Sequence, residues 1–190
     1  MEELINTAKE YVSILFSSQS SEKLSYHNFE HTLEVLENVN EIGNNAALSN
    51  DEINLVKLAA IFHDVGWIID GNKHETKSTE IAKDFLSSNG SDQSDISKVV
   101  DLICITDLKT TPKTPAQMVL RDADILHIGQ KGFYSKSQLL RSEKKVLKNK
   151  IFSELEWIES NIEFLTANHF YTDYAIKNYE PRKQKNIFKL

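Results

Sequence analysis

The sequence predicts an all-α fold, arranged as a single compact domain of about eight helices. Glycine and proline are scarce, with six and three residues among 190, and a chain so poor in turn-forming residues is rarely all-β. Apolar residues recur at helical spacing along most of the chain, whereas the alternation typical of strands is nowhere convincing. The length suffices for one domain with a sizeable core, and no linker or internal repeat divides it.

Five helices are expected in the first 105 residues. Apolar spacing places them at residues 2–17, 28–42, 49–62, 76–88 and 92–105. A polar loop is expected at residues 17–21. Ser49 and Glu52 form the capping-box pattern at the start of the third helix. That helix is apolar over most of its surface near its end, so we expect it to be central and buried.

A loop and four further helices complete the prediction. Residues 106–115 contain two prolines and four threonines, which is typical of a loop. Gly129 and Gly132 interrupt the chain after the next helix. The remaining helical segments are expected at residues 116–128, 137–148, 150–168 and 172–179.

Charge and cysteine content restrict the partners and the compartment. The net charge of −6 argues against a nucleic acid or an anionic membrane as partner, since both favour a basic surface. No window approaches the roughly 20 apolar residues of a membrane span, and the acidic first ten residues do not resemble a signal segment. Cys104, the single cysteine, is expected to be a small buried hydrophobe. With no intrachain disulfide possible, we expect a cytoplasmic protein.

Four of the six histidines lie between residues 27 and 74, and the first two are four positions apart. On a helix this spacing brings His27 and His31 to one face. If Asn28 caps the helix instead, His27 lies just outside it and His31 lies in its first turn. In either arrangement, His27 can lie near a metal ion without binding it.

The second cluster, His63-Asp64, follows the most apolar helix, and Gly66 permits that helix to end there. A charged Asp64 beside a buried apolar run is costly unless it is paired or bound to a cation. The third cluster, Asp122 and Asp124, lies within an otherwise apolar helix. Either a metal ion or Arg121 would compensate these acids.

Imidazole and carboxylate groups together suit divalent metal ions. Two of each leave positions open for water and substrate, which is the arrangement needed to activate water and polarise a phosphoryl oxygen. Taken singly, each of these residues has a simpler interpretation as a hydrogen-bonded core residue. The combination and order of the clusters favour a metal site.

That order resembles the signature of the HD superfamily of metal-dependent phosphohydrolases. The stretches that look like its three motifs are residues 26–32, 59–66 and 122–129. The resemblance spans about residues 24–132 and implies one helical HD-type domain over 1–190, with residues 135–190 forming its C-terminal helices. The first motif is similar both to small bacterial HD hydrolases and to cyclic-nucleotide phosphodiesterases.

The resemblance also implies roles for individual residues. The implied metal ligands are His31, His63, Asp64 and Asp124. Asp64 would also reach a second ion. Asp122 would support the helix or a ligand, or would take the place of Asp124 as the ligand. His27 matches the position that protonates the leaving oxygen, a task suited to histidine because its pKa lies near neutrality. The implied cofactor is one or two divalent ions of manganese, magnesium, iron, cobalt, nickel or zinc.

His74 and Glu75 match a stretch that follows the His-Asp pair in small bacterial members. They would help to hold a second ion or to position water, or they would simply form a solvated first helical turn. Lys73, Lys109 and Lys113 lie in loops that could border the site and meet phosphates, although most loop lysines are merely solvated. Trp67 would either stack on a base or pack beside the site.

The function that follows is hydrolysis of a small-molecule phosphoester, with a nucleotide as the expected substrate. One alternative is a phosphodiesterase acting on cyclic nucleotides or alarmones. Another is a non-catalytic sensor module that binds metal and nucleotide. The presence of His27 beside a complete ligand set argues against the sensor. The substrate and the oligomeric state are not determined by the sequence.

Overall fold

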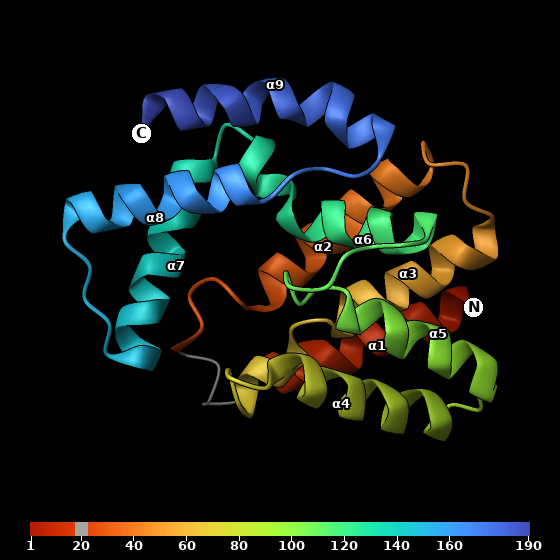
Figure 1. The fold of residues 1–190 in the computed structure, drawn as a ribbon. Coiled ribbons are helices and arrows are strands. Elements are labelled where there is room, and N and C mark those ends of the chain that lie inside the picture. The colour runs from red at the N-terminus through yellow and green to blue at the C-terminus, as the bar shows by residue number, and fades with distance from the viewer. Residues whose placement is uncertain (18–22) are drawn as a thin grey trace.

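The structure is a computed structural model that describes residues 1–17 and 23–190. Within these residues the chain forms nine α-helices and two short 3₁₀ segments, and no strand is present, which confirms the all-α prediction (Figure 1). The helices are α1 (Glu2–Phe16), α2 (Phe29–Gly43), α3 (Asn50–Phe62), α4 (His74–Ser88), α5 (Gln93–Cys104), α6 (Pro115–Ile125), α7 (Phe133–Lys148), α8 (Glu154–Ala167) and α9 (Asp173–Lys189). The 3₁₀ segments are η2 (Val65–Ile68) and η3 (Leu126–Gly129).

The helix α3 is the centre of the core, as its apolar sequence predicts. Its residues 58–62 are fully or almost fully buried, and helices α1, α2, α5 and α6 pack around it. The predicted capping box is present, because the Ser49 side chain accepts from the Glu52 backbone while the Glu52 carboxylate accepts from the Ser49 backbone. Because α3 is capped at its start and buried at its end, it fixes the position of the residues that follow Phe62.

The C-terminal helices form a separate wall of the molecule. Figure 1 shows α7 and α8 on one side of the bundle and α9 across its top. Asn186 of α9 anchors this helix to the core by donating hydrogen bonds of 2.9 Å to the carbonyl oxygens of Ile128 and Gln130. Helix α7 contacts η3, the segment that directly follows α6.

Helix boundaries differ from the prediction mainly in this C-terminal part. Helix α7 begins four residues earlier than expected and α8 four residues later, at the capping box of Ser153. Helix α9 continues through Pro181 to Lys189 instead of ending at residue 179. Proline removes one backbone donor, but tertiary hydrogen bonds from the side chains of Lys183 and Asn186 hold the later turns in place.

Two further expectations concern Cys104 and the first loop. The expectation that Cys104 is buried is wrong: it is exposed, because Leu102 and Ile103 take the inward face of α5 and leave Cys104 on its outer face. Residues 18–21 of the first predicted loop lie outside the described part of the chain. None of the described helices is both long enough and apolar enough to cross a lipid bilayer.

Candidate metal centre and its cavity

The start of α2 places His31. Asn28 is the N-cap of this helix, and its side-chain oxygen accepts the backbone N–H of His31 at 3.0 Å. Of the two arrangements that the sequence allowed, the structure therefore has His27 outside the helix and His31 in its first turn. The His31 side chain is only 5% exposed and points into the molecule.

The end of α3 places His63 and Asp64. The helix stops at Phe62, and Asp64 adopts φ −109° and ψ 0° before the 3₁₀ segment η2. Gly66 is required here because a Cβ atom would overlap the carbonyl oxygen of His74 and lie 2.7 Å from the backbone nitrogen of Ser78. The Gly66 N–H donates to the Ser78 hydroxyl at 2.9 Å, so α4 packs directly against the turn.

Four side chains from these elements and from α6 converge on one point. The Nε2 atom of His31 lies 3.3 Å from Asp124 Oδ1 and 3.6 Å from Asp64 Oδ2. The Nε2 atom of His63 lies 3.2 Å from Asp64 Oδ2 and 3.5 Å from Asp124 Oδ1. Potential ligand atoms of His31, His63 and Asp124 all lie within 4.8 Å of one another. The structure therefore brings together all four residues that the family resemblance implies as ligands.

The donor set of this cluster fits a divalent cation. The Nδ1 atom of His63 lies 2.8 Å from the Ala60 carbonyl oxygen, to which it donates, so in the neutral ring Nε2 carries the lone pair. This Nε2 atom is buried without a hydrogen-bond partner in the described part of the chain, and it faces two carboxylates. A lone pair opposite two anions is unfavourable, and either a metal ion or a proton between them removes the repulsion. Two imidazoles and two carboxylates match the ligands that first-row divalent ions accept.

The pKa shifts of the clustered side chains also indicate a site that favours a bound cation. Burial lowers the pKa of His63, but Asp64 and Asp124 outweigh it and raise that pKa well above its usual value. The pKa of His31 is likewise raised, because hydrogen bonds with Asp124 and Glu34 outweigh burial. Burial raises the pKa of Asp124, but His31 and His63 outweigh it and hold the carboxylate in its charged form. Without a metal ion, the cluster would therefore bind protons in its place.

The histidine outside the helix, His27, lies beside the cluster and is held by Glu143 of α7. Its Nδ1 atom hydrogen-bonds Glu143 Oε1, and its backbone N–H donates to Glu143 Oε2 at 3.0 Å. The backbone N–H of Tyr26 donates to the same oxygen at 2.8 Å. Burial raises the pKa of Glu143, but the bonds with His27 and Tyr26 outweigh it and lower that pKa overall. Glu143 was not predicted to belong to the site.

A stack of three rings joins His27 to His74. The Trp67 ring lies between them, with centroid distances of 4.1 Å to His27 and 4.5 Å to His74. The Nε2 atom of His74 lies 4.0 Å from Asp64 Oδ1 and 3.3 Å from Glu75 Oε1. His74 and Glu75 are thus beside the carboxylate oxygen of Asp64 that faces away from His31 and His63. Of the two roles expected for Trp67, packing beside the site agrees with this position.

The other charged residues of the third cluster face elsewhere. Asp122 accepts from the backbone N–H groups of Tyr171 and Thr172, at 2.8 and 2.7 Å, and from the Thr172 hydroxyl at 2.7 Å. Arg121 donates to carbonyl oxygens of the loop before α6, at Ile105, Asp107 and Thr110. Asp122 therefore supports the start of α9, and Arg121 shapes the loop that carries Lys109.

A cavity of about 330 Å³ opens over the cluster. Its floor includes Asp64, Asp124 and His27, and Lys109 borders it from the loop before α6. Helices α7 and α8 supply a wall that the sequence did not predict, made of Leu140, Glu143, Lys144, Leu147, Lys148 and Phe164. Among the loop lysines of the prediction, Lys73 and Lys113 are exposed and do not line this cavity.

Comparison with known proteins agrees with this geometry. The family model described as HD domain matches residues 28–129, which is more than half of the chain. No curated protein and no solved structure gives a significant match. The matched segment begins at the cap of α2, ends with η3 and contains the four converging side chains. The chain therefore belongs to the HD domain family, whose members are in general metal-dependent phosphohydrolases.

Proposed function

We propose that this chain hydrolyses a phosphoester of a small molecule, with a nucleotide as the expected substrate. The observation that carries the proposal is the buried Nε2 atom of His63, which has no hydrogen-bond partner in the described residues and faces Asp64 and Asp124. We assign His31, His63, Asp64 and Asp124 as the ligands of a divalent ion. When bound, such an ion supplies Lewis-acid chemistry that activates water and offsets charge on the phosphoryl oxygens.

The role of His27 is to protonate the leaving oxygen. Its Nδ1 atom is engaged by Glu143, which leaves Nε2 as the ring nitrogen free to deliver a proton into the cavity. The Glu143 carboxylate favours a proton on Nδ1 and stabilises the doubly protonated ring before transfer. Because Glu143 also accepts the backbone N–H of His27, the ring is fixed at both its backbone and its side chain.

A second ion would be held on the other side of Asp64. The Oδ1 atom of Asp64 lies near His74 Nε2, and Glu75 lies beside that imidazole. These three residues are the proposed ligands, and we therefore keep the proposed metal content at one or two ions per chain. The metals to be tested are manganese, magnesium, iron, cobalt, nickel and zinc.

The cavity supports an organic substrate rather than an inorganic one. The side chains of Leu140, Leu147 and Phe164 form an apolar wall beside the acidic floor. A pocket of this volume is of the size that takes small organic ligands. The apolar wall would pack against the organic part of the substrate, while the phosphate lies toward Asp64 and Asp124.

The test is a product-release screen of the purified protein with each of these metals. The substrates are nucleoside mono-, di- and triphosphates, cyclic nucleotides and alarmones. Asp64→Ala is expected to abolish release and weaken metal binding, whereas Asp101→Ala, a change of an exposed acid on α5, is expected to do neither. Full activity and full metal content in Asp64→Ala would contradict the proposal.

The same screen separates the alternative functions. Release from cyclic nucleotides or alarmones, without release from monoesters, would identify a phosphodiesterase. Uptake of metal and nucleotide without any product would identify a binding module, and ligand-induced thermal shifts would measure that uptake.

A further inference from the structure

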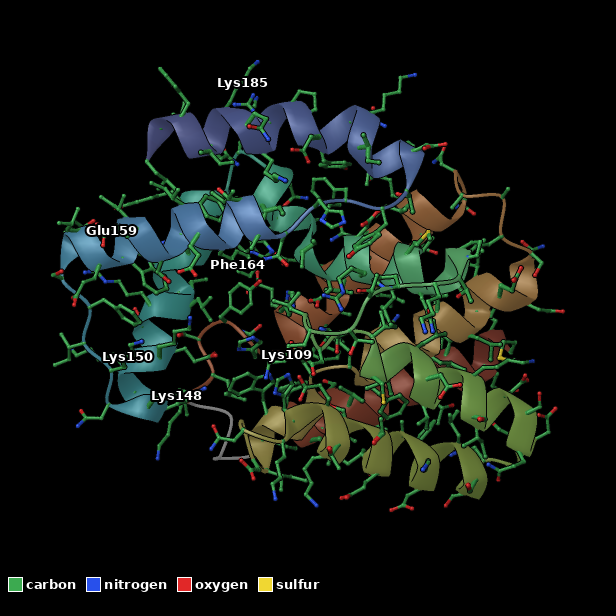
Figure 2. All side chains as sticks on the ribbon, viewed as in Figure 1. Lys109, Lys148, Lys150, Glu159, Phe164 and Lys185 are labelled. Atoms are coloured by element: carbon green, nitrogen blue, oxygen red, sulfur yellow. The ribbon has the colours of Figure 1, made fainter. Side chains whose placement is uncertain are left out.

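Three lysines border the cavity from outside the metal centre. Lys109 lies in the loop before α6, and Lys144 and Lys148 lie on α7. Both α7 lysines fall outside residues 28–129, the segment that the family model matches. Figure 2 shows Lys148 at the end of α7, Lys109 near the middle of the molecule and Phe164 projecting from α8 into the space between them.

Lys148 is tied to the candidate proton donor through one aromatic ring. Its ammonium nitrogen lies 5.9 Å from the centroid of the Trp67 ring. The Trp67 ring in turn stacks on His27. A cation near a tryptophan ring is weakly attracted by it, so this contact favours a position of the exposed Lys148 ammonium beside the site.

Lys144 is half-buried and stands among like charges. Its ammonium nitrogen lies 5.5 Å from the centroid of the Trp157 ring. Burial lowers the pKa of Lys144, and the charges of Lys148 and Lys150 lower it further, while neighbouring Glu143 opposes them. An anion bound between Lys144 and Lys148 would reduce the repulsion that Glu143 only partly offsets.

The carboxylates around the cavity already have other partners. In the described part of the chain, no carboxylate oxygen lies within 4.0 Å of the ammonium nitrogen of Lys109, Lys144 or Lys148. Glu143 is occupied by His27, and Asp64 by the imidazoles of the metal centre. Lys136 of α7 differs from these three lysines, because its ammonium group is paired with the Glu34 carboxylate.

We propose that Lys144 and Lys148, together with Lys109, bind a second phosphate group of the substrate, apart from the phosphate that is cleaved. The substrate class is then a small molecule with at least two phosphate groups, one at Asp64 and Asp124 and the next at the lysines. Lysine suits the second position because its ammonium is a mobile point charge that binds phosphate from several directions. This inference rests on the proposed function, which assigns the cleaved phosphate to the metal centre.

The test compares binding of a double and a single phosphate by titration calorimetry. The probes are imidodiphosphate, whose P–N–P link resists hydrolysis, and orthophosphate, each added to the full-length protein loaded with manganese. The variants are Lys144→Gln/Lys148→Gln and, as a matched control, Lys145→Gln, which removes an exposed lysine of α7 that does not line the cavity. Melting temperatures verify that each variant is folded.

Imidodiphosphate is expected to bind at least about tenfold more weakly to the double variant than to the unmodified protein, since charge-assisted hydrogen bonds are lost. Orthophosphate, held at the metal centre, is expected to change less than about twofold, and Lys145→Gln is expected to change neither. Equal affinity of both proteins for imidodiphosphate, or no binding by the unmodified protein, would overturn the inference. The binding assay needs no turnover. A failure of the lysine substitutions to weaken imidodiphosphate binding can therefore be distinguished from a failure of the protein to hydrolyse phosphoesters.

Discussion

Glu143 binds His27 at two points, through the ring Nδ1 atom and through the backbone N–H. The carboxylate comes from α7, and its residue is only 1% exposed. A buried acid that fixes an imidazole in this way sets both its orientation and the nitrogen on which a proton resides. The contact therefore links the C-terminal helices to the chemistry proposed at the metal centre.

Glu143→Gln is expected to lower kcat by roughly 10- to 100-fold, which is the usual effect of losing a group that orients an imidazole. Metal content should stay unchanged, because Glu143 contacts none of the four candidate ligands. Steady-state kinetics and metal analysis provide the two measurements. Glu159→Gln, a change of an exposed acid on α8, is the control and should leave both unchanged. Equal loss of metal and activity in Glu143→Gln would point to a structural role instead.

Metal binding is expected to release protons. In the metal-free protein the carboxylates of the cluster raise the pKa values of His31 and His63, and a ligand nitrogen must lose its proton to bind metal. Affinity for manganese should therefore fall as the pH falls through these raised pKa values. Calorimetry at pH 7 in buffers of different ionisation enthalpy should show a net release of protons on metal binding. Uptake without proton release would show that the histidines are not ligands.

Asp122→Ala is expected to destabilise the protein by about 2–4 kcal/mol, because it leaves the backbone N–H groups of Tyr171 and Thr172 without their acceptor. Urea unfolding at neutral pH measures this change. Metal content per folded chain should remain that of the unmodified protein, since both carboxylate oxygens of Asp122 bond the α8–α9 connection. Loss of metal without loss of stability would place Asp122 among the groups that support the ion.

Gly66→Ala is expected to destabilise the fold by about 3 kcal/mol or more, because the added methyl group meets the backbone of α4 at His74 and Ser78. Gly132→Ala is the matched control, since a Cβ there has no atom within 4 Å and the backbone φ of −79° suits alanine. Thermal unfolding of the two variants measures the difference. Equal melting temperatures would mean that η2 and α4 move apart at little cost.

The parts of the site that the sequence predicts are those that local patterns specify. Asn28 caps α2 three residues before His31, and a sequence scan detects this spacing directly. The His63-Asp64 pair follows an apolar helix and precedes Gly66, so burial and a helix end are both visible in neighbouring residues. The convergence of these residues with Asp124 is implied by the resemblance to HD proteins, not by any local pattern.

The parts that it does not predict depend on contacts between distant segments. Glu143 lies among lysines and serines of an ordinary polar helix, and it becomes part of the site only because α7 packs against residue 27, 116 positions away. Lys144 and Lys148 likewise gain their place from that packing. Helix α9 runs past Pro181 because later side chains find tertiary partners, which overrides the local signal to stop.

The metal centre and the cavity wall formed by α7 and α8 come from different parts of the chain, and this separation has a consequence for evolution. The four candidate ligands belong to α2, α3 with its following turn, and α6, whereas Lys144, Lys148 and the apolar wall of Leu140, Leu147 and Phe164 belong to helices after residue 129. Under the proposed function, substitutions on α7 and α8 are expected to alter which molecules the cavity accepts while the candidate ligands keep their positions. Glu143 is the exception, because it ties α7 to His27. Substrate preference can therefore change during evolution through substitutions in α7 and α8, provided that Glu143 is retained.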